Sequence, residues 1–335
     1  MNNIEQHPEV KFGKTGILIV NLGTPDSTRW WDVRKYLKEF LSDKRVIELN
    51  PVLWKVILNL FILTFRPSKS ARAYKKIWLK ETNESPLLFY TKAQRDKLKK
   101  RIENNNVLVE FAMRYGNPSI SSKLLSLKQN GCENIIILPL YPQYAAATTA
   151  TVCDEVYRTL MKMRWQPSLQ IIPHYESEPK YISCLIQTIK KKISTISWKP
   201  DLILASFHGI PKSYFDKGDP YQCYCQKTTR LMKEKFSDIP IEISFQSRFG
   251  PSAWLEPYTD KTLKTLPRKN IKNLLVICPG FSSDCVETLE EINIEGRETF
   301  IENGGKNFDL IPCLNDSDEH IDLLEGLIDK YLILK

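Results

Sequence analysis

The chain has 335 residues, of which 42% are hydrophobic and 26% are charged, and its formal net charge is +9. This composition excludes a largely disordered chain, because enough apolar side chains are present to form a large core. The positive charge would suit nucleic acid, an anionic membrane surface or an acidic small molecule. The basic, aromatic-interleaved motifs of common RNA- and DNA-binding modules are missing, so no nucleic-acid partner is expected.

The first ten residues are polar and lack the basic start and apolar core of a secretory signal. We therefore expect a cytoplasmic protein, whose eight cysteines are mostly buried thiols and not a disulfide framework. Cys223 and Cys225 form a close pair, but a closed zinc site needs four ligands and no second pair lies nearby. Neither a structural zinc nor an iron–sulfur cluster is expected at this pair.

The first predicted element is a strand over residues 16–22, an apolar run that leads into Gly23 and Pro25. Six more short apolar runs follow, each ending in a loop that contains proline or glycine, and helical patterns lie between them. Runs of this kind are typical of strands buried on both faces of a parallel sheet. The further runs are 107–113, 135–138, 169–172, 202–207, 241–245 and 274–278.

An apolar segment over residues 54–65 lies between the first two predicted strands. Its length of about 12 residues is too short to span a bilayer, which takes roughly 20. Five basic residues follow it: Arg66, Lys69, Arg72, Lys75 and Lys76. Two interpretations are open: a buried or half-buried helix, or an amphipathic lip that contacts a membrane surface or an apolar ligand.

The alternation of strands and helices predicts an α/β protein with parallel sheets. Seven strands with their helices are too many for one small sheet, so we expect two similar domains that meet at a cleft. The first three runs form an N-terminal set and the last four a C-terminal set, with the boundary near residues 164–168. The predicted domains are 14–165 and 166–317, followed by a C-terminal helix within 318–335 that packs back on the first domain.

In open α/β sheets, ligands bind beyond the carboxyl ends of the strands. The seven loops that leave these ends should therefore gather polar and aromatic side chains near one cleft. They carry Asn21, Arg114, Tyr115, Tyr141, His208, Gln246 and Phe281. The sequence lacks the glycine-rich motifs of dinucleotide and nucleotide phosphate sites and the G-x-S-x-G motif of serine hydrolases, so none of these functions is supported.

His208 stands at the end of the strand 202–207, directly before Gly209. A neutral imidazole at this place can accept a proton or bind a metal near pH 7. A lone histidine is more often a core residue that is hydrogen-bonded to the backbone. The turn Gly209 to Pro211 would keep the backbone open and favours the functional interpretation somewhat.

Three carboxylates, Asp284, Glu287 and Glu291, follow the last predicted strand at helical spacing. On an α-helix they would share one face, opposite apolar residues. Asp284 with Glu287 also fits a capping box, and acidic residues near a helix N-terminus interact favourably with the helix dipole. The same row of carboxylates could guide a divalent cation or relay protons.

Aromatic and basic residues near the predicted strand ends could hold a flat ligand that bears carboxylates. Arginine forms bidentate contacts with carboxylates, and aromatic side chains stack on planar rings. Each of these residues, taken singly, is more often structural. The candidates are Arg114, Tyr115, Tyr74, Ser85 and Trp254.

Several segments, in the same order along the chain, resemble the ferrochelatase family over about residues 15–330. No single segment would suffice, but the set in this order is specific. The segments are 16–25, 141–144 with Thr148 and Thr149, 206–211, 218–221, 245–251 with 254–255 and 257–260, and 284–291.

The resemblance implies a two-domain, Rossmann-like chelatase fold without a nucleotide. It implies a lyase that inserts ferrous iron into protoporphyrin IX, giving protohaem and releasing two protons. His208 and Glu287 match the family's catalytic and metal-contacting pair, and Asp284 and Glu291 match the acidic row beyond it. Arg114, Tyr115 and Ser85 match positions near the porphyrin propionates or the pocket wall.

The chain departs from parts of the family at two positions. Cys285 stands where some relatives carry a histidine, which weakens any scheme that needs a second imidazole. Ala146 stands where cluster-bearing relatives have a cysteine ligand, and the chain stops at Lys335 without their cysteine-rich extension. We therefore expect no iron–sulfur cluster and no other prosthetic group, with Fe²⁺ as a substrate. We also expect a monomer, which the 54–65 lip could hold at the inner membrane surface.

For the mechanism, we expect neutral His208 to accept pyrrole protons while Glu287, with Asp284 and Glu291, conducts protons or metal. A division in which His208 and Glu287 share the iron is equally compatible with the sequence. Two other functions stay open: a porphyrin or haem carrier without catalysis, and a chelatase for coproporphyrin or for another metal.

Overall fold

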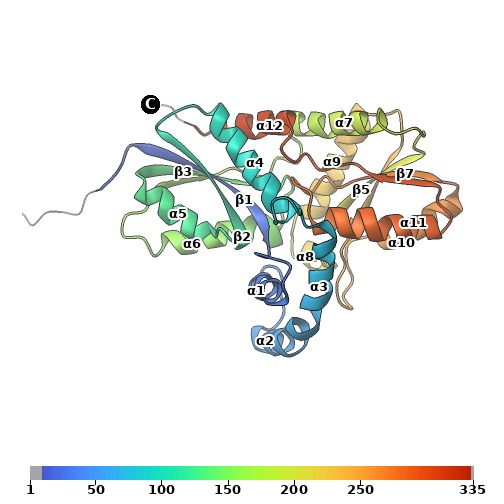
Figure 1. Cartoon of the computed structure of the whole chain (residues 1–335), viewed down its shortest axis with the longest axis horizontal. Helices are drawn as coiled ribbons and strands as arrows, with labels where there is room; N and C mark the ends of the chain where they lie inside the picture. Colours follow the sequence, from blue (N-terminus) through green and yellow to red (C-terminus); the bar gives the residue numbers. More distant parts are fainter. Residues whose placement is uncertain (1–9, 333–335) are drawn as a thin grey trace, which may run out of the picture.

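The computed structural model describes residues 10–332, which form two four-stranded parallel sheets with helices on both faces (Figure 1). The predicted α/β fold with two parallel sheets is confirmed. Residues 1–9, on which the expected absence of a secretory signal depends, lie outside the described residues, as do residues 333–335 of the predicted C-terminal segment.

The two sheets have the same strand topology, with a central pair flanked by one strand on each side. In the first, the order is β2 (Val107–Gly116), β1 (Lys14–Thr24), β3 (Cys132–Pro139) and β4 (Ser168–Ile171). In the second, the order is β6 (Ile241–Gln246), β5 (Leu202–His208), β7 (Asn273–Ile277) and β8 (Asn307–Leu310). All neighbouring strands pair in parallel.

The prediction that the strand 169–172 belongs with the C-terminal set was wrong. β4 pairs with β3, with Asn134 opposite Ser168, so it completes the first sheet. The chain therefore changes sheets between Ile171 and Leu202 and not near residue 165. The sequence also gave no sign of β8, a strand of only four residues. Both are short edge strands, and hydrophobicity alone does not say which strand an edge strand pairs with.

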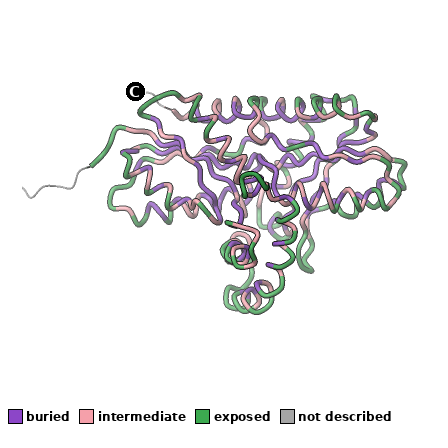
Figure 2. Tube along the Cα trace, in the orientation of Figure 1, coloured by how far each residue is buried: buried purple, intermediate pink, exposed green. Residues whose placement is uncertain are grey.

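The central strands are buried on both faces, as their continuous apolar runs predicted. Ile17 and Ile19 pack into one hydrophobic cluster and Leu18 and Val20 into another, because alternate side chains of a strand point to opposite faces. Figure 2 shows this buried layer running through both sheets. The carboxyl ends of the strands are thereby held in place by packing.

Twelve α-helices within residues 10–332 cover the sheets or project from them. They are α1 (Trp30–Leu41), α2 (Pro51–Ile57), α3 (Leu63–Ile77), α4 (Pro86–Arg101), α5 (Ile120–Gln129), α6 (Thr151–Leu160), α7 (Pro179–Ile193), α8 (Lys212–Asp216), α9 (Tyr221–Lys235), α10 (Thr259–Thr265), α11 (Arg297–Glu302) and α12 (Asp318–Asp329). Three π-helices, η1 (Leu58–Ile62), η2 (Ala146–Ala150) and η4 (Glu287–Gly296), and the 3₁₀ helix η3 (Leu266–Lys269) complete the described elements.

The last helix, α12, lies along α4 and α7. Arg101 of α4 forms ion pairs with Asp322 and Glu325 of α12, and Lys97 of α4 pairs with Asp318 at its start. α4 leads into β2 of the first sheet, and α7 leads toward β5 of the second. The helix therefore bridges the two halves of the molecule.

We call residues 51–77, which comprise α2, η1 and α3, the lip. With α1 they project from the body of the molecule (Figure 1). Trp54, Leu58 and Leu63 face inward and are buried, whereas Leu60 and Phe61 are exposed. The segment is thus half-buried and amphipathic. Among residues 10–332 no helix combines the length and apolar character needed to cross a bilayer.

The backbone near the end of β1 requires a glycine. Gly23 has φ +117°, and a Cβ there would lie 1.8 Å from the carbonyl oxygen of Tyr115. Only glycine tolerates both this backbone conformation and this approach. The close contact joins the ends of β1 and β2 at the base of the projecting helices.

Candidate active site

His208 is the last residue of β5 and is half-buried. Its Nδ1 lies 2.7 Å from the carbonyl oxygen of Gly209. A carbonyl oxygen only accepts hydrogen bonds, so Nδ1 is the donor, and in the neutral form of the ring Nε2 is the nitrogen that holds the lone pair. That nitrogen can accept a proton or bind a cation. The structure therefore places an imidazole at the strand end with its Nε2 without a hydrogen-bond partner among the described residues.

The acidic segment forms a π-helix, η4, and not the α-helix on which the spacing of its carboxylates was interpreted. The wider π-helical turn leaves residues four apart close to one face, and π-helices occur often at functional sites. Along this face Glu287 and Glu291 are half-buried and Glu295 is exposed. The row thus reaches solvent at Glu295. Glu295 was missed, although its spacing from Glu291 could have revealed it.

Glu291 is bound by the residues that follow β6. Its carboxylate accepts hydrogen bonds from the backbone N–H of Ser247 at 2.7 Å and from the Ser247 hydroxyl at 2.5 Å. Burial raises the pKa of Glu291, while the Ser247 hydrogen bond and the nearby His208 lower it. The imidazole is therefore close enough to interact with this carboxylate.

Asp284 precedes η4 and is buried. One carboxylate oxygen accepts from the Thr288 hydroxyl at 3.1 Å and the Cys313 N–H at 3.3 Å, and the other from the Asn315 side chain at 2.7 Å. These contacts fix the start of η4. None of them belongs to the predicted capping box between Asp284 and Glu287. A role of Asp284 in a relay stays a prediction.

Arg114 and Tyr115 of β2 are held by an acid that the sequence did not reveal. The Arg114 guanidinium lies 2.5 Å from Asp43, and the Tyr115 hydroxyl donates to the same carboxylate at 2.9 Å. Arg114 Nε also donates to the Thr151 carbonyl at 2.8 Å. Both side chains therefore have partners within the chain. Asp43 lies in the loop after α1, so the pair ties β2 to the projecting helices.

Tyr74 and Ser85 lie beside Glu287. Both line a cavity of about 10 Å³ together with Thr24 and Glu287, which is about the room that one water molecule needs. Burial raises the pKa of Tyr74, and the nearby Glu287 carboxylate raises it further. The Ser85 hydroxyl accepts the Leu88 N–H at 3.2 Å and so caps α4.

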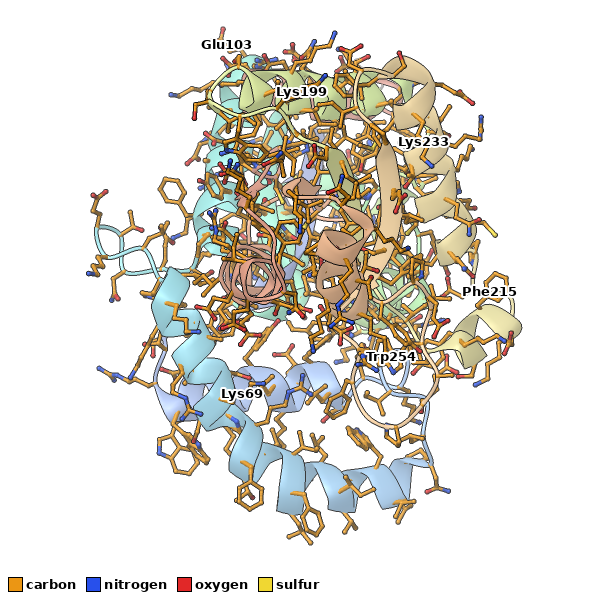
Figure 3. All side chains as sticks on the ribbon, turned by 90° about the vertical axis from the view of Figure 1, so that its right-hand side faces the viewer. Lys69, Glu103, Lys199, Phe215, Lys233 and Trp254 are labelled. Atoms are coloured by element: carbon orange, nitrogen blue, oxygen red, sulfur yellow. The ribbon has the colours of Figure 1, made fainter. Side chains whose placement is uncertain are left out.

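Trp254 lies between the body and the lip. In the view of Figure 3 it is labelled at the level where the body of the molecule meets the projecting helices, one of which, α3, carries Lys69. Its ring carbon Cε3 would lie 3.2 Å from a Cβ added at Gly209, so the indole packs beside the turn after His208. Its Nε1 donates to the Phe249 carbonyl at 2.9 Å. The indole therefore forms part of the wall near His208.

Arg66 of the lip also faces this region, although sequence analysis did not separate it from the neighbouring basic residues. Its guanidinium carbon lies 4.4 Å from the centre of the Phe249 ring. Burial lowers the pKa of Arg66, and the Glu287 carboxylate raises it. Elsewhere, Lys76 of α3 pairs with Glu290 of η4 at 2.8 Å. The lip and the acidic helix are thus in contact.

Taken together, the structure brings His208, Glu287 and Glu291 to one region, with Tyr74 and Trp254 beside it. Imidazole and carboxylate groups accept protons and contact divalent cations, although no three such ligands are clustered to hold a metal ion among residues 10–332. The half-buried setting limits access by water. The arrangement therefore suits chemistry in which a proton leaves and a cation enters.

Comparisons with known proteins point to one family. A family model for ferrochelatase matches residues 14–332. A ferrochelatase of Francisella tularensis subsp. tularensis is 54% identical over 334 residues, covering 98% of this chain and 99% of the relative. One from F. tularensis subsp. novicida is 54% identical over 329 residues, covering 97% of this chain and 98% of the relative.

Two solved structures share the fold at low sequence identity. SirB from Bacillus subtilis with Fe³⁺ has a TM-score of 0.59 and 10% identity, covering 95% of each chain. CbiX, described as the terminal enzyme for biosynthesis of sirohaem in denitrifying bacteria, has a TM-score of 0.52 and 12% identity, covering 95% of this chain and 100% of its own. At these identities the likeness concerns the fold alone.

Proposed function

The chain belongs to the ferrochelatase family, and from this premise we propose that His208 and Glu287 carry its reaction. The protein is a lyase that inserts ferrous iron into a porphyrin in haem synthesis. Protoporphyrin IX is the porphyrin that we propose as its substrate. The observation that carries the assignment of residues is the imidazole of His208, whose Nδ1 donates to Gly209 and whose Nε2 is free beside the acidic row.

The reaction replaces two pyrrole N–H bonds by bonds to iron and releases two protons. A base must therefore receive protons near the ring, and a path must bring in a partly desolvated cation. His208 Nε2 is the proposed proton acceptor. General-base catalysis of this kind typically contributes about 10²–10⁴-fold.

Glu287 and Glu291 are the proposed path for metal and protons, with Asp284 as its predicted continuation. The row along η4 becomes more exposed toward Glu295, which supports a connection with solvent. Glu287 also lies beside Tyr74, in the small cavity under the lip. In this arrangement His208 and Glu287 meet the iron at the porphyrin, and Glu291 links them to the outer part of the row.

The remaining predicted residues are proposed to form and support the porphyrin pocket. Tyr74 and Trp254 would supply apolar wall next to Glu287 and His208. Ser85 caps the helix that follows the lip. Arg114 and Tyr115 would act through Asp43, by holding the loop that leads into the projecting helices.

We also propose that the protein works as a cytoplasmic monomer without a prosthetic group, with iron only as substrate. Both sheets contribute to the site within one chain, which supports the monomer. The exposed apolar residues of the lip, with the basic residues Arg72 and Lys75 nearby, support a peripheral contact with an anionic membrane surface.

The test of the function is anaerobic absorbance spectroscopy of the purified protein with protoporphyrin IX and ferrous iron. We expect conversion of the free-base spectrum to the haem spectrum. Coproporphyrin in place of protoporphyrin IX, and cobalt in place of iron, should react more slowly. Tight porphyrin binding without any conversion would refute the proposal and support a carrier.

A further inference from the structure

Gln246 joins the strand that carries His208 to the acidic helix. It is the residue of β6 that lies opposite His208 of β5, and its carbonyl oxygen accepts the Gly209 N–H at 2.8 Å. Its side-chain Nε2 donates to the backbone carbonyl of Glu287 at 2.9 Å and approaches Glu291 at 3.4 Å. Gln246 thus contacts the turn after His208 through its backbone carbonyl and the acidic helix through its buried side-chain amide.

A buried chain of hydroxyls fixes the orientation of this amide. The Ser206 hydroxyl donates to Gln246 Oε1 at 2.7 Å, and it lies 2.9 Å from the hydroxyl of Thr259, which donates to Ser244 at 2.8 Å. Because Oε1 is occupied as an acceptor, Nε2 must face η4. Networks of this kind hold a side chain in one arrangement when every member is satisfied.

Ser247, the next residue, adopts a backbone conformation that serines rarely occupy. Its φ is +64°, in the left-handed region. This conformation turns both its N–H and its hydroxyl toward the Glu291 carboxylate, at 2.7 and 2.5 Å. Hydrogen bonds to a charged acceptor are stronger than those between neutral groups. The strained residue therefore makes its two strongest contacts with a residue of the proposed relay.

We infer that Gln246 and Ser247 form a clamp that positions Glu291 against His208 and so sets the rate of iron insertion. This inference rests on the proposed function of Glu291 and His208. The clamp residues do not touch the reacting atoms; they act through Glu291 and are positioning residues. A clamp of this kind should change turnover without changing how tightly the porphyrin is bound.

The alternative role for the Ser247 hydroxyl is a contact with a carboxylate of the porphyrin. In the structure the hydroxyl is already donated to Glu291. The two roles predict different kinetics: loss of a positioning residue lowers kcat, whereas loss of a substrate contact raises the KM for porphyrin. They can therefore be separated in one experiment.

The test compares Ser247→Gly and Ser247→Ala with the matched control Ser252→Gly, an exposed serine of the same loop. Both Ser247 variants lose the hydroxyl and keep the backbone N–H. Glycine also relieves the positive φ, whereas alanine retains it, so Ser247→Gly should be at least as stable as the parent and Ser247→Ala somewhat less stable. If both variants lose activity although only Ser247→Ala loses stability, the missing hydroxyl is the cause, as a positioning role requires.

We expect both Ser247 variants to lose about tenfold in kcat for iron insertion, the effect expected of one hydrogen bond to a charged group. Their KM for porphyrin should stay at the parent value, and Ser252→Gly should behave as the parent. In a Glu291→Gln background, Ser247→Gly should cause no further loss, because the two residues act as a unit.

Parent-like kcat in both Ser247 variants, a change confined to the KM for porphyrin, or full additivity with Glu291→Gln would overturn the clamp while leaving the proposed function intact. A parent protein that inserts no iron would overturn both. The two failures are distinguished because the parent is measured in the same assay.

Discussion

The two halves of the molecule have the same strand topology but supply different things to the site. β1 and β5 occupy corresponding places in the two sheets: β1 lies between β2 and β3, and β5 lies between β6 and β7. β1 ends near Asn21, which is buried and donates to Thr91 at 3.0 Å. β5 ends at His208, whose Nε2 is free. Near its carboxyl end β1 thus holds a structural amide, whereas β5 ends in the imidazole proposed to react.

The difference originates in the connections that leave the two strands. The connection from β1 to β2 carries α1, the lip and α4, whereas the one from β5 to β6 carries only α8 and α9. The first half therefore builds the wall and the lip, and the second half contributes His208 and the carboxylates of η4. Parallel sheets position loops at one edge, and the loops decide the chemistry.

The most severe test of this division is His208→Ala. Removal of the imidazole should lower turnover at least about 100-fold, because a general base is worth roughly 10²–10⁴-fold. Porphyrin affinity, which the first half is expected to dominate, should change little. Stopped-flow absorbance gives the turnover, and fluorescence titration gives the affinity.

Asn21→Ala is the matched variant at the corresponding strand end of the first half. It should lower stability, because the Thr91 hydroxyl loses a buried partner, and it should leave turnover per folded molecule within a few fold. If both variants lost turnover equally, the division between wall and chemistry would be wrong.

Two glycines provide the second test: Gly23, the last residue but one of β1, and Gly209, which follows β5. Gly23→Ala combines a forbidden φ with a contact of 1.8 Å to the Tyr115 carbonyl, and should cost about 4 kcal/mol of stability. At Gly209 a Cβ would lie 3.0 Å from the Gln246 carbonyl oxygen without a positive φ. We expect Gly209→Ala to cost clearly less. Urea unfolding measures both, and the reverse order would contradict the structural comparison.

The sequence predicted seven of the eight strands described within residues 10–332, and the fold class, because continuous apolar runs report burial on both faces. It misplaced β4 because burial does not identify a strand's partner. It predicted an α-helix where η4 is a π-helix. A π-helix has about one residue more in each turn than an α-helix. In η4 this wider turn is accompanied by hydrogen bonds from the Gln246 side chain and the Ser247 N–H. Local hydrophobicity does not encode such long-range contacts.

The position of His208 and of the acidic row could be predicted because each directly follows a strand. The partners of Arg114 and Tyr115 could not, since Asp43 lies 71 and 72 residues away in sequence. Arg66 could not be distinguished either, because it is one of several basic residues after an apolar segment. Long-range partners depend on how the projecting helices fold back, and no local pattern reports this.

The third test concerns α12, the helix that bridges the two halves. It uses His320 at the start of this helix. Its Nδ1 donates to the Asn315 carbonyl at 2.6 Å, and Asn315 also donates to Asp284. Burial lowers the pKa of His320 from 6.5 to about 4. Above about pH 6.5 the folded and unfolded states both hold a neutral imidazole, so this contribution to stability is fully present.

As the pH falls from about 6.5 toward 4, the unfolded state takes up a proton that the folded state does not, and stability is lost. The lowered pKa corresponds to roughly 3 kcal/mol over this range. Urea unfolding of the parent and of His320→Gln at pH 7.5 and pH 4.5 isolates the effect. The variant should lose less stability on acidification than the parent; equal losses would show that His320 is not buried neutral.

The smallest expected effect concerns the lip, which distinguishes the first half most clearly from the second. Leu60 and Phe61 are 63% and 59% exposed, so Leu60→Ser with Phe61→Ser should leave stability nearly unchanged. If the lip contacts a membrane, the double variant should bind phosphatidylglycerol vesicles more weakly by about 2 kcal/mol, or roughly thirtyfold. Vesicle sedimentation measures the binding.

Leu125→Ser with Met161→Ser is the control, because these apolar side chains are 45% and 81% exposed, on α5 and directly after α6, away from the lip. A general preference of apolar surface for vesicles would weaken both double variants alike and remove the lip from the argument. A loss confined to the lip variant would mean that the longer connection of the first half serves two purposes. It would then build the porphyrin wall on its inner side and present a membrane-contacting surface on its outer side.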